Sequence, residues 1–234
     1  MRNYITIDST DCRTFGLYIS GSGVFNAPTR SLDMRQVPGR DGDLIGPSTR
    51  LQNGTLTYPA FIFNNFKTNI ANLRAFLSSS STYRRLVDTY HPNEYRLVVF
   101  RGPLTVEPTR MLDAGQFDLV FECMPQRWLI VDDTTLTASG TISNPTKFTS
   151  RPLLRVYGTG TLGIGSQSIT ISQADTYTDI DCDICYAYKG SVSKNSYVSV
   201  SGGVDFPTLP SGNTGITLGT GITKVVITPR WFTV

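Results

Sequence analysis

The stretch Val37-Pro-Gly-Arg-Asp-Gly-Asp-Leu44 consists almost entirely of residues that favour turns. Pro38 fixes its own φ, Gly39 and Gly42 permit positive φ, and the two aspartates can hydrogen-bond to their own backbone. Short apolar segments lie immediately before and after it. The sequence therefore predicts a long β-hairpin arm that reaches into solvent, with a returning strand from Leu51 to Thr57.

Short strands separated by turn residues are predicted on both sides of the arm. Tyr4-Ile-Thr-Ile7 and Gly16-Leu-Tyr-Ile19 precede it, and Thr57-Tyr-Pro-Ala-Phe-Ile-Phe63 follows it. The dipeptide Asn53-Gly54 is a second hairpin signal. Pro59 indicates that the last segment is an edge strand or contains a bend, because proline cannot donate to a strand ladder.

The apolar periodicity changes after residue 65. Apolar residues now recur at spacings of four and three, at Phe66, Ile70, Leu73 and Leu77. This spacing predicts one amphipathic helix, capped by Asn64 or Asn65 and ended by the serines 78–81. A second short helical turn is expected around Thr82 to Val87.

Three more strands are predicted in the first half of the chain, at Tyr95–Phe100, Leu104–Pro108 and Gly115–Met124. The last has the clearest alternation, with Phe117, Leu119, Phe121 and Cys123 on one face and Asp118, Val120 and Glu122 on the other. We expect Pro125-Gln-Arg-Trp128 to end this strand.

Residues 131–150 contain few apolar residues and predict a domain boundary near Ser139. Beyond it, the sequence predicts strands at Leu153–Tyr157, Gln167–Ser172, Tyr177–Tyr186 and Tyr197–Val200, a loop at Leu209–Gly215 and a last strand at Gly221–Pro229. This spacing is typical of an antiparallel β-sandwich. The predicted fold is therefore mainly β, with an α+β domain over residues 1–137 and a sandwich over residues 138–234.

Composition supports this fold class and narrows the function. Of 234 residues, 39 % are hydrophobic and 17 % charged, and 23 are Tyr or Phe, which suit pleated surfaces. The net charge of +3 and the scattered Lys and Arg give no stripe for nucleic acid. No apolar segment is long enough to span a bilayer, and the N-terminus alternates like a strand instead of a signal peptide. We expect synthesis in a cytoplasm, without a disulfide framework.

Two motifs resemble ligand-binding sites, but a purely structural role explains each of them better. Gly158-Thr-Gly-Thr-Leu-Gly163 matches a dinucleotide fingerprint, yet strand and turn residues follow it where a helix is required, so we interpret it as a loop. Cys182-Asp-Ile-Cys185 resembles a metal-binding pair. In a strand these two cysteines would face opposite sides, so Cys182 is better interpreted as a core residue beside Ile180 and Ile184. No metal or cofactor is expected.

The candidate catalytic groups are acidic. Asp179, Asp181 and Asp183 alternate with apolar residues along one predicted strand, and could form a carboxylate pair. The same alternation is typical of a solvent-exposed face, which is the interpretation we favour. The single histidine, His91, lies in a turn context, and no nucleophile motif accompanies it. The protein is therefore not expected to be an enzyme.

Several segments in order resemble the distal tail proteins of siphophages. They are Val37–Leu44, Asn72-Leu-Arg-Ala-Phe-Leu77, Tyr83-Arg-Arg-Leu-Val-Asp88, His91-Pro, Tyr95-Arg-Leu-Val98, Val106-Glu107 and Phe117–Pro125. In the second half Asn144-Pro, Pro152–Gly158, Ile180-Asp-Cys-Asp183, Phe206–Asn213 and Val225–Trp231 resemble the galectin-like sandwich of the same family. The resemblance covers nearly the whole chain.

This resemblance implies a structural virion protein at the tail tip, made in the bacterial host. Residues 1–137 would form a homo-hexameric ring, and residues 138–234 would be a galectin-like domain that projects outward. The ring would join the tail tube protein to a tail-tip protein and to a receptor-binding protein, and DNA would pass through its channel. Exposed sheet edges agree with a closed ring, because a partner must pair with them. The residues expected at the interface between copies are Val37, Gly39, Arg40, Asp41, Gly42 and Asp43.

Two other functions remain open. A carbohydrate-binding module for host cell-wall glycan would use an exposed aromatic residue, with Trp231 and Tyr188 as candidates and Trp128 near the boundary. No cluster of the galectin type surrounds either tryptophan, and a fold alone does not make a lectin. An enzyme that acts on wall polymer would depend on Asp181 or Asp183.

Overall fold

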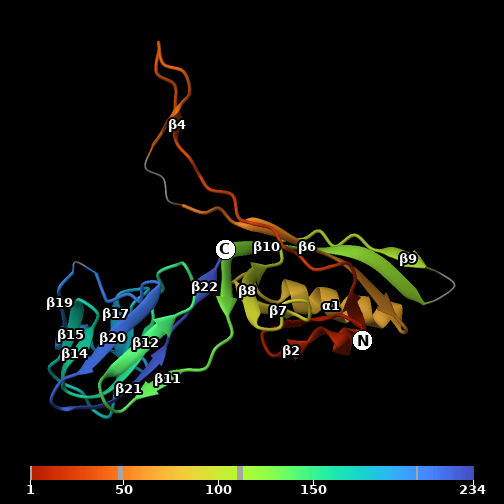
Figure 1. Cartoon of the computed structure of the whole chain (residues 1–234). Helices are drawn as coiled ribbons and strands as arrows, with labels where there is room; N and C mark the ends of the chain where they lie inside the picture. The colour runs from red at the N-terminus through yellow and green to blue at the C-terminus, as the bar shows by residue number, and fades with distance from the viewer. Residues whose placement is uncertain (1, 47–49, 110–112, 204) are drawn as a thin grey trace. The chain divides into compact units, whose positions relative to one another are not determined.

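The computed structural model describes residues 2–46, 50–109, 113–203 and 205–234. Contacts divide the chain into unit 1, Met1–Arg127 with Val234, and unit 2, Trp128–Thr233. This division falls before the boundary expected after residue 137. Strands make up nearly all of the regular structure, so the prediction of a mainly β fold is confirmed (Figure 1).

Unit 1 contains one curled antiparallel sheet, one helix and the arm. Its elements are β1 (Ile5–Ile7), β2 (Thr10–Asp11), β3 (Leu17–Ile19), β4 (Met34–Arg35), β5 (Leu44–Ile45), β6 (Gly54–Phe63), α1 (Phe66–Ser78), β7 (Arg84–Asp88), β8 (Glu94–Val99), β9 (Glu107–Thr109) and β10 (Ala114–Leu129), with a 3-10 turn at Cys12–Phe15. The strand order is β2-β1-β7-β8-β10-β6-β3, and β9 pairs with β10. The Ile19 N–H donates to the Asn3 carbonyl at 2.9 Å, so β3 meets the segment that precedes β1.

The longest pairing in the sheet joins β6 to β10. It extends from Gly54 opposite Cys123 to Phe63 opposite Ala114. Side chains that alternate along both strands are buried against α1, among them Leu56, Tyr58, Ile62, Leu119 and Phe121, together with Ile70, Leu73 and Leu77 of the helix. The predicted alternation of β10 and the predicted helical face are therefore confirmed.

The N-terminus of α1 differs from the prediction. Asn65 occupies the N-cap position, but its φ is 49° and its side chain makes no capping hydrogen bond. Instead, the Phe66 N–H donates to the carboxylate of Asp113, the residue just before β10, at 3.2 Å. A residue distant in sequence thus replaces the local cap.

The predicted second helical turn at residues 82–87 is wrong. Residues 84–88 form β7, which pairs with β1 on one side and β8 on the other. Leu86 and Asp88 are buried, whereas Arg85 is exposed and Val87 is half-buried, so the side chains alternate as in a strand. Pairing with β1, from the start of the chain, and with the following strand β8 decides the conformation of this short segment.

The two prolines in the long strands also behave differently from expectation. Pro125 does not end β10, which continues to Leu129, because the pairing with β6 already stops at Cys123. β6 is an interior strand despite Pro59. The Ser20 N–H donates to the Pro59 carbonyl at 2.8 Å, just beyond β3, so proline costs only the last bond of that ladder. Gly54 begins β6 and forms no hairpin turn.

Unit 2 is an antiparallel sandwich of two sheets, as predicted. Its strands are β11 (Thr134–Leu136), β12 (Gly140–Asn144), β13 (Leu153–Gly158), β14 (Gly160–Ile164), β15 (Gln167–Ile171), β16 (Thr178–Asp181), β17 (Tyr186–Lys189), β18 (Val192–Ser193), β19 (Val198–Ser201), β20 (Gly212–Leu218), β21 (Ile222–Thr228) and β22 (Phe232–Thr233), with a 3-10 turn at Asn195–Tyr197. One sheet has the order β11-β21-β13-β16-β17-β18 and the other β12-β20-β14-β15-β19. Leu154, Val156, Leu162, Ile169, Ile180 and Val225 are fully buried in its core.

Three predictions for unit 2 are wrong in detail. Residues 131–150, where a boundary near Ser139 was predicted, contain β11 and β12, which belong to the two sheets, and the units divide earlier, at Arg127/Trp128. Residues 177–186 are not one strand, since the chain turns at residues 182–185 between β16 and β17. The expected loop at 209–215 contains the start of β20.

The glycine-rich motif connects strands. β13 ends at Gly158 and β14 begins at Gly160, so strand follows where a nucleotide site needs a helix. Gly158 has a φ of 99°, and the Gly221 carbonyl lies so close that a Cβ would clash with it. Close approach of backbones therefore accounts for the glycine.

A buried carboxylate ties the core of unit 1 together. Asp88 is 4 % exposed and accepts the Tyr58 O–H at 2.6 Å. It also accepts the N–H groups of Tyr90 and His91 at 2.9 and 2.8 Å, and its Oδ1 lies 3.1 Å from Nδ1 of His91. His91 is therefore held by an aspartate in a turn.

We predict that Asp88→Ala lowers the free energy of unfolding by about 3 kcal/mol, because it leaves several buried donors without an acceptor. Urea denaturation of the full chain measures this change. The control is Asp118→Ala on the exposed face of β10, for which a loss below about 0.5 kcal/mol is expected. Equal losses in both variants would contradict the prediction.

Candidate assembly interface

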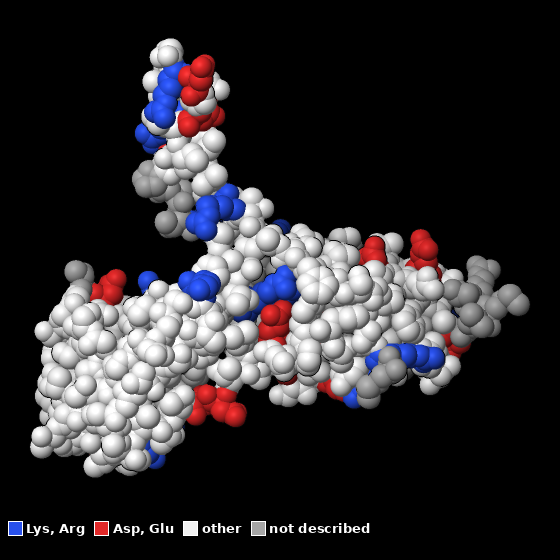
Figure 2. Space-filling view, viewed as in Figure 1, with Lys and Arg blue, Asp and Glu red and all other residues white. Residues whose placement is uncertain are grey.

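The predicted interface residues lie together at the turn between β4 and β5. They are Val37, Gly39, Arg40, Asp41, Gly42 and Asp43, and all are exposed. Gly39 and Gly42 have φ values of 81° and 77°, and the Arg40 N–H donates to the Val37 carbonyl at 3.2 Å. The predicted turn is confirmed, and Figure 2 shows basic and acidic side chains next to one another at its end.

The arm is a thin two-stranded ladder. Its pairs are Met34 with Ile45, Arg35 with Leu44 and, nearer the sheet, Arg30 with Leu51. β4 and β5 pair only with each other among the described strands. An isolated two-stranded hairpin is marginally stable in water, so this segment requires support from outside itself.

Apolar side chains on the arm are exposed to an unusual degree. The large exposed hydrophobic residues between residues 25 and 45 are Phe25, Leu32, Met34, Val37, Leu44 and Ile45. Ile45 is 64 % exposed and Met34 52 %. Clustered exposed apolar residues of this kind mark a surface that binds a partner.

Two side chains of the sheet and one from the turn between β7 and β8 hold the root of the arm. Arg96 of β8 donates to the Val24 carbonyl at 2.7 Å, and Arg127 of β10 donates to the Asn26 carbonyl at 2.7 Å. The Tyr90 hydroxyl donates to the Gly21 carbonyl at 2.7 Å. Sequence reasoning missed these residues, because bonds to backbone carbonyls of a distant loop leave no local pattern.

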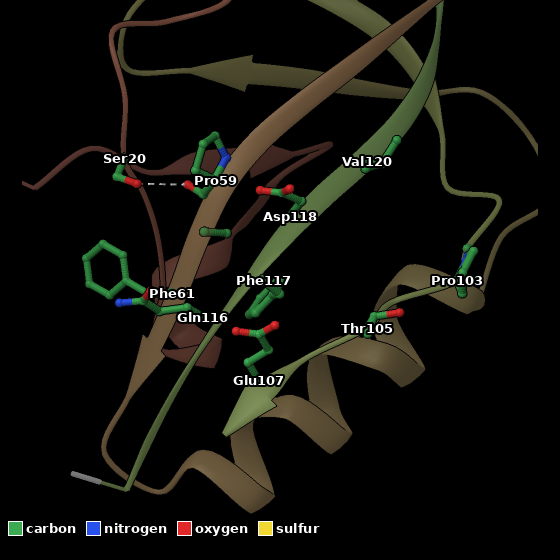
Figure 3. A pocket seen from close by; sticks show the side chains of 12 residues that line it. Ser20, Pro59, Phe61, Pro103, Thr105, Glu107, Gln116, Phe117, Asp118 and Val120 are labelled. Atoms are coloured by element: carbon green, nitrogen blue, oxygen red, sulfur yellow. Dashed lines mark hydrogen bonds between the residues drawn. The ribbon is translucent and has the colours of Figure 1, made fainter. Parts of the chain in front are cut away.

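An open groove of about 650 Å³ lies on the outer face of β6 and β10, next to residues 102–107. Figure 3 shows Pro59 and Phe61 from β6 and Asp118 and Val120 from β10 around it. Glu107 and Asp118 are its carboxylates, and both are exposed. No described histidine or cysteine lines the groove.

Asp179 and Asp181 of unit 2 are not on a solvent face, which corrects the prediction for these two of the three aspartates. Asp179 is bound by Arg155 through two hydrogen bonds of 2.7 and 2.9 Å. Asp181 is bound by Arg230 through two of 2.7 and 2.8 Å. Both carboxylates are buried, at 5 % and 8 % exposure. Each is therefore a structural ion pair with defined geometry.

These pairings argue against an acid catalyst at this strand. Burial alone would raise the pKa of Asp181, but the hydrogen bonds from Arg230, the backbone hydrogen bonds from Asp183 and Ile184 and the charge of Arg230 together outweigh it and lower the pKa. A general acid requires the opposite shift. Asp183 lies in the turn, is mostly exposed and is 3.7 Å from Arg151.

The cysteine pair lies in a turn and not in a strand. Cys182 is buried in the core as predicted, whereas Ile184 is 65 % exposed and does not belong to that core. Cys185 is exposed and carries a free thiol, like the three buried cysteines. Within the described ranges, no group of three or more His, Cys, Asp or Glu side chains is placed to hold a metal.

The tryptophans give no sugar-stacking platform. Trp231 is 4 % exposed, so its proposed role in glycan binding is wrong. The indole N–H of Trp128 is buried, and its ring packs against Phe232 with centroids 5.2 Å apart. Tyr188 is half-buried, like Trp128, and stacks on Tyr186 with centroids 6.1 Å apart, so it stays a candidate.

The sequence matches no family model, and no curated protein matches it. Solved structures do. The crystal structure of the Dit protein (gp 19.1) of phage SPP1, described as a paradigm of the hub adsorption apparatus in phages that infect Gram-positive bacteria, aligns over 100 % of both chains with a TM-score of 0.71 and 15 % identity. A chain of the phage p2 baseplate in its activated conformation aligns over 96 % of this chain and 97 % of its own, with a TM-score of 0.51 and 10 % identity.

The expected resemblance to distal tail proteins is therefore confirmed at the level of the fold. The alignment with the SPP1 protein includes both units of the chain. No helix among the described residues is long and apolar enough to cross a membrane.

We predict that the ion pair of Asp181 makes unit 2 sensitive to acid. Its folded-state pKa is lowered from 3.8, so its contribution to stability is present above that value and is lost as the pH falls through the folded pKa. The loss of stability between about pH 5 and about pH 2 should therefore be smaller in Asp181→Asn than in the native chain. Urea denaturation across this range measures the difference.

The matched control is Asp183→Asn, two residues away in the exposed turn. Its pH dependence should follow that of the native chain. A pH dependence in Asp181→Asn that equals the control would show that the pair does not act in this way.

Proposed function

We propose that this protein is a structural component of a phage tail tip that works by assembly and not by catalysis. The observation that carries the proposal is the full-length similarity to the SPP1 Dit protein, which is described as a paradigm of the hub adsorption apparatus. The similarity to a chain of the p2 baseplate supports the same type of role.

In this proposal unit 1 forms a ring of six copies, and the arm reaches the neighbouring copy. The physical support is the arm itself, which exposes apolar side chains and is too thin to be stable alone. A ring of head-to-tail contacts covers one arm per copy and closes without leaving a free arm. Val37, Gly39, Arg40, Asp41, Gly42 and Asp43 would lie at that contact.

The ring would join the tail tube protein to a tail-tip protein and surround a channel for DNA. The sandwich over residues 138–234 would project outward and dock a receptor-binding protein. Its buried Arg155–Asp179 and Arg230–Asp181 pairs keep one sheet of this sandwich rigid, which suits a platform better than a catalytic cleft. Host-wall glycan binding is the alternative for this domain.

Light scattering of the purified chain, followed by negative-stain imaging, tests the assembly. We expect a mass close to six times the 25.7 kDa of one chain, and ring-shaped particles. A monomer at every concentration would contradict the proposal. Glycan-array binding by that monomer would favour the carbohydrate-binding alternative.

We predict that replacing three exposed arm residues weakens the ring without unfolding the chain. Val37→Ser, Leu44→Ser and Ile45→Ser combined should raise the dissociation constant at least about tenfold, or ~1.4 kcal/mol, because apolar surface buried at the contact is lost. The control is Ile184→Ser with Val192→Ser, which are similarly exposed on unit 2. Equal weakening by both sets would exclude the arm as the contact.

A further inference from the structure

A second pocket of unit 1 lies at the root of the arm and is lined by two arginines. It has a volume of about 230 Å³, and its walls come from residues 26–29, residues 54–55 and the two strands β8 and β10. Arg96 and Arg127 are the charged residues that line it, and no carboxylate does. The pocket is therefore positive and is large enough for a small anionic group.

The positive charge of the pocket is poorly compensated. Arg96 is only 5 % exposed, and within the described chain it forms no ion pair with a carboxylate. Arg127 approaches Glu94 at 3.5 Å, a long contact for an ion pair, and otherwise donates to carbonyls. Burying a guanidinium without a carboxylate is unfavourable, so a carboxylate that entered the pocket would supply the counter-charge that Arg96 lacks.

At its other end, the tip, the arm carries carboxylates that lack a cationic partner among the described residues. Asp41 and Asp43 are exposed at the tip, and neither is in an ion pair with a described residue. Arg40 is the single basic residue of that turn, so the tip has a net negative charge. Tip and pocket are complementary in charge.

We propose that the pocket lined by Arg96 and Arg127 receives an aspartate, Asp41 or Asp43, from the arm tip of a second copy of this chain. Each copy carries one tip and one pocket, so the contact repeats head to tail and can close a ring. The inference rests on the proposed function and adds the acceptor for the arm. The planar guanidinium groups would grip the carboxylate through paired hydrogen bonds.

Photo-crosslinking locates the contact. Arg40, at the tip, is replaced by p-benzoylphenylalanine in unlabelled chain, which is assembled with chain labelled with nitrogen-15. We expect crosslinks between differently labelled chains to residues 26–29, 54–55 or 123–127. Crosslinks to any other surface, or only within one chain, would overturn the inference. If the particles were nevertheless hexameric in that case, the proposed function would still stand.

A charge exchange tests the chemistry. Asp41→Asn with Asp43→Asn should raise the dissociation constant of the assembly at least about tenfold, while the control Asp133→Asn, on the exposed surface of unit 2, leaves it unchanged. Arg127→Glu alone should weaken assembly, and Arg127→Glu combined with Asp41→Arg and Asp43→Arg should restore it. Circular dichroism and thermal unfolding show whether Arg127→Glu folds. If Arg127→Glu does not fold, Arg127→Gln is used in its place. Arg127→Gln should weaken assembly, and Asp41→Arg with Asp43→Arg should not restore it.

Competition with inorganic phosphate tests whether the pocket binds a free anion or the arm tip of a second copy. Phosphate should weaken assembly of the native chain by competition and have less effect on the Asp41→Asn, Asp43→Asn variant. Phosphate binding together with assembly that is indifferent to both aspartates would assign the pocket to a free anion and overturn the inference. A chain that never assembles would overturn both this inference and the proposed function.

Discussion

The backbone pairing between β6 and β10 is the constraint on which unit 1 depends. Ten residues of β6 face β10 in one register, which directs alternate side chains of both strands into the core beside α1. A slip by one residue would turn every one of those side chains outward. The returning strand of the arm leads into β6 at Gly54, so the register of the sheet also fixes where the arm begins.

The two units can be compared by the partners of their buried charged groups and by the exposure of their apolar side chains and strand edges. In unit 2 the buried aspartates find arginines inside the same unit, and every strand belongs to one of its sheets or pairs with the end of β10. In unit 1 the core is equally complete, but the arm exposes apolar residues and unpaired strand edges. The arm is therefore the segment of unit 1 whose exposed strand edges are covered by no other described strand.

Local pattern predicted the elements whose conformation is locally determined. The helical spacing from Phe66 to Leu77, the alternation of β10 and the turn at residues 37–44 all reflect short-range geometry. The helical turn predicted at residues 82–87 was wrong because pairing with β1, about eighty residues earlier in the chain, and with the neighbouring strand β8 makes residues 84–88 a strand. The prediction of a solvent-exposed face was wrong for Asp179 and Asp181 because their partners, Arg155 and Arg230, lie 24 and 49 residues away in the sequence. Periodicity cannot show that an alternating aspartate is buried against such a partner.

The same limit applies to the candidate interface. The turn residues of the tip could be predicted one by one, whereas the pocket at the root is built from the loop at 26–29 and from strands β8 and β10. Only the folded chain brings these parts together. Composition correctly indicated that the fold is mainly β, since that property is an average over many residues.

The turn between β16 and β17 gives the chain a chemical handle. Three of the four thiols are buried and only Cys185 is exposed. A maleimide dye or a heavy-metal cluster added under native conditions would therefore attach at one defined point of unit 2. Attached in this way, the reporter would mark the radius and azimuth of every sandwich domain in images of an assembled particle.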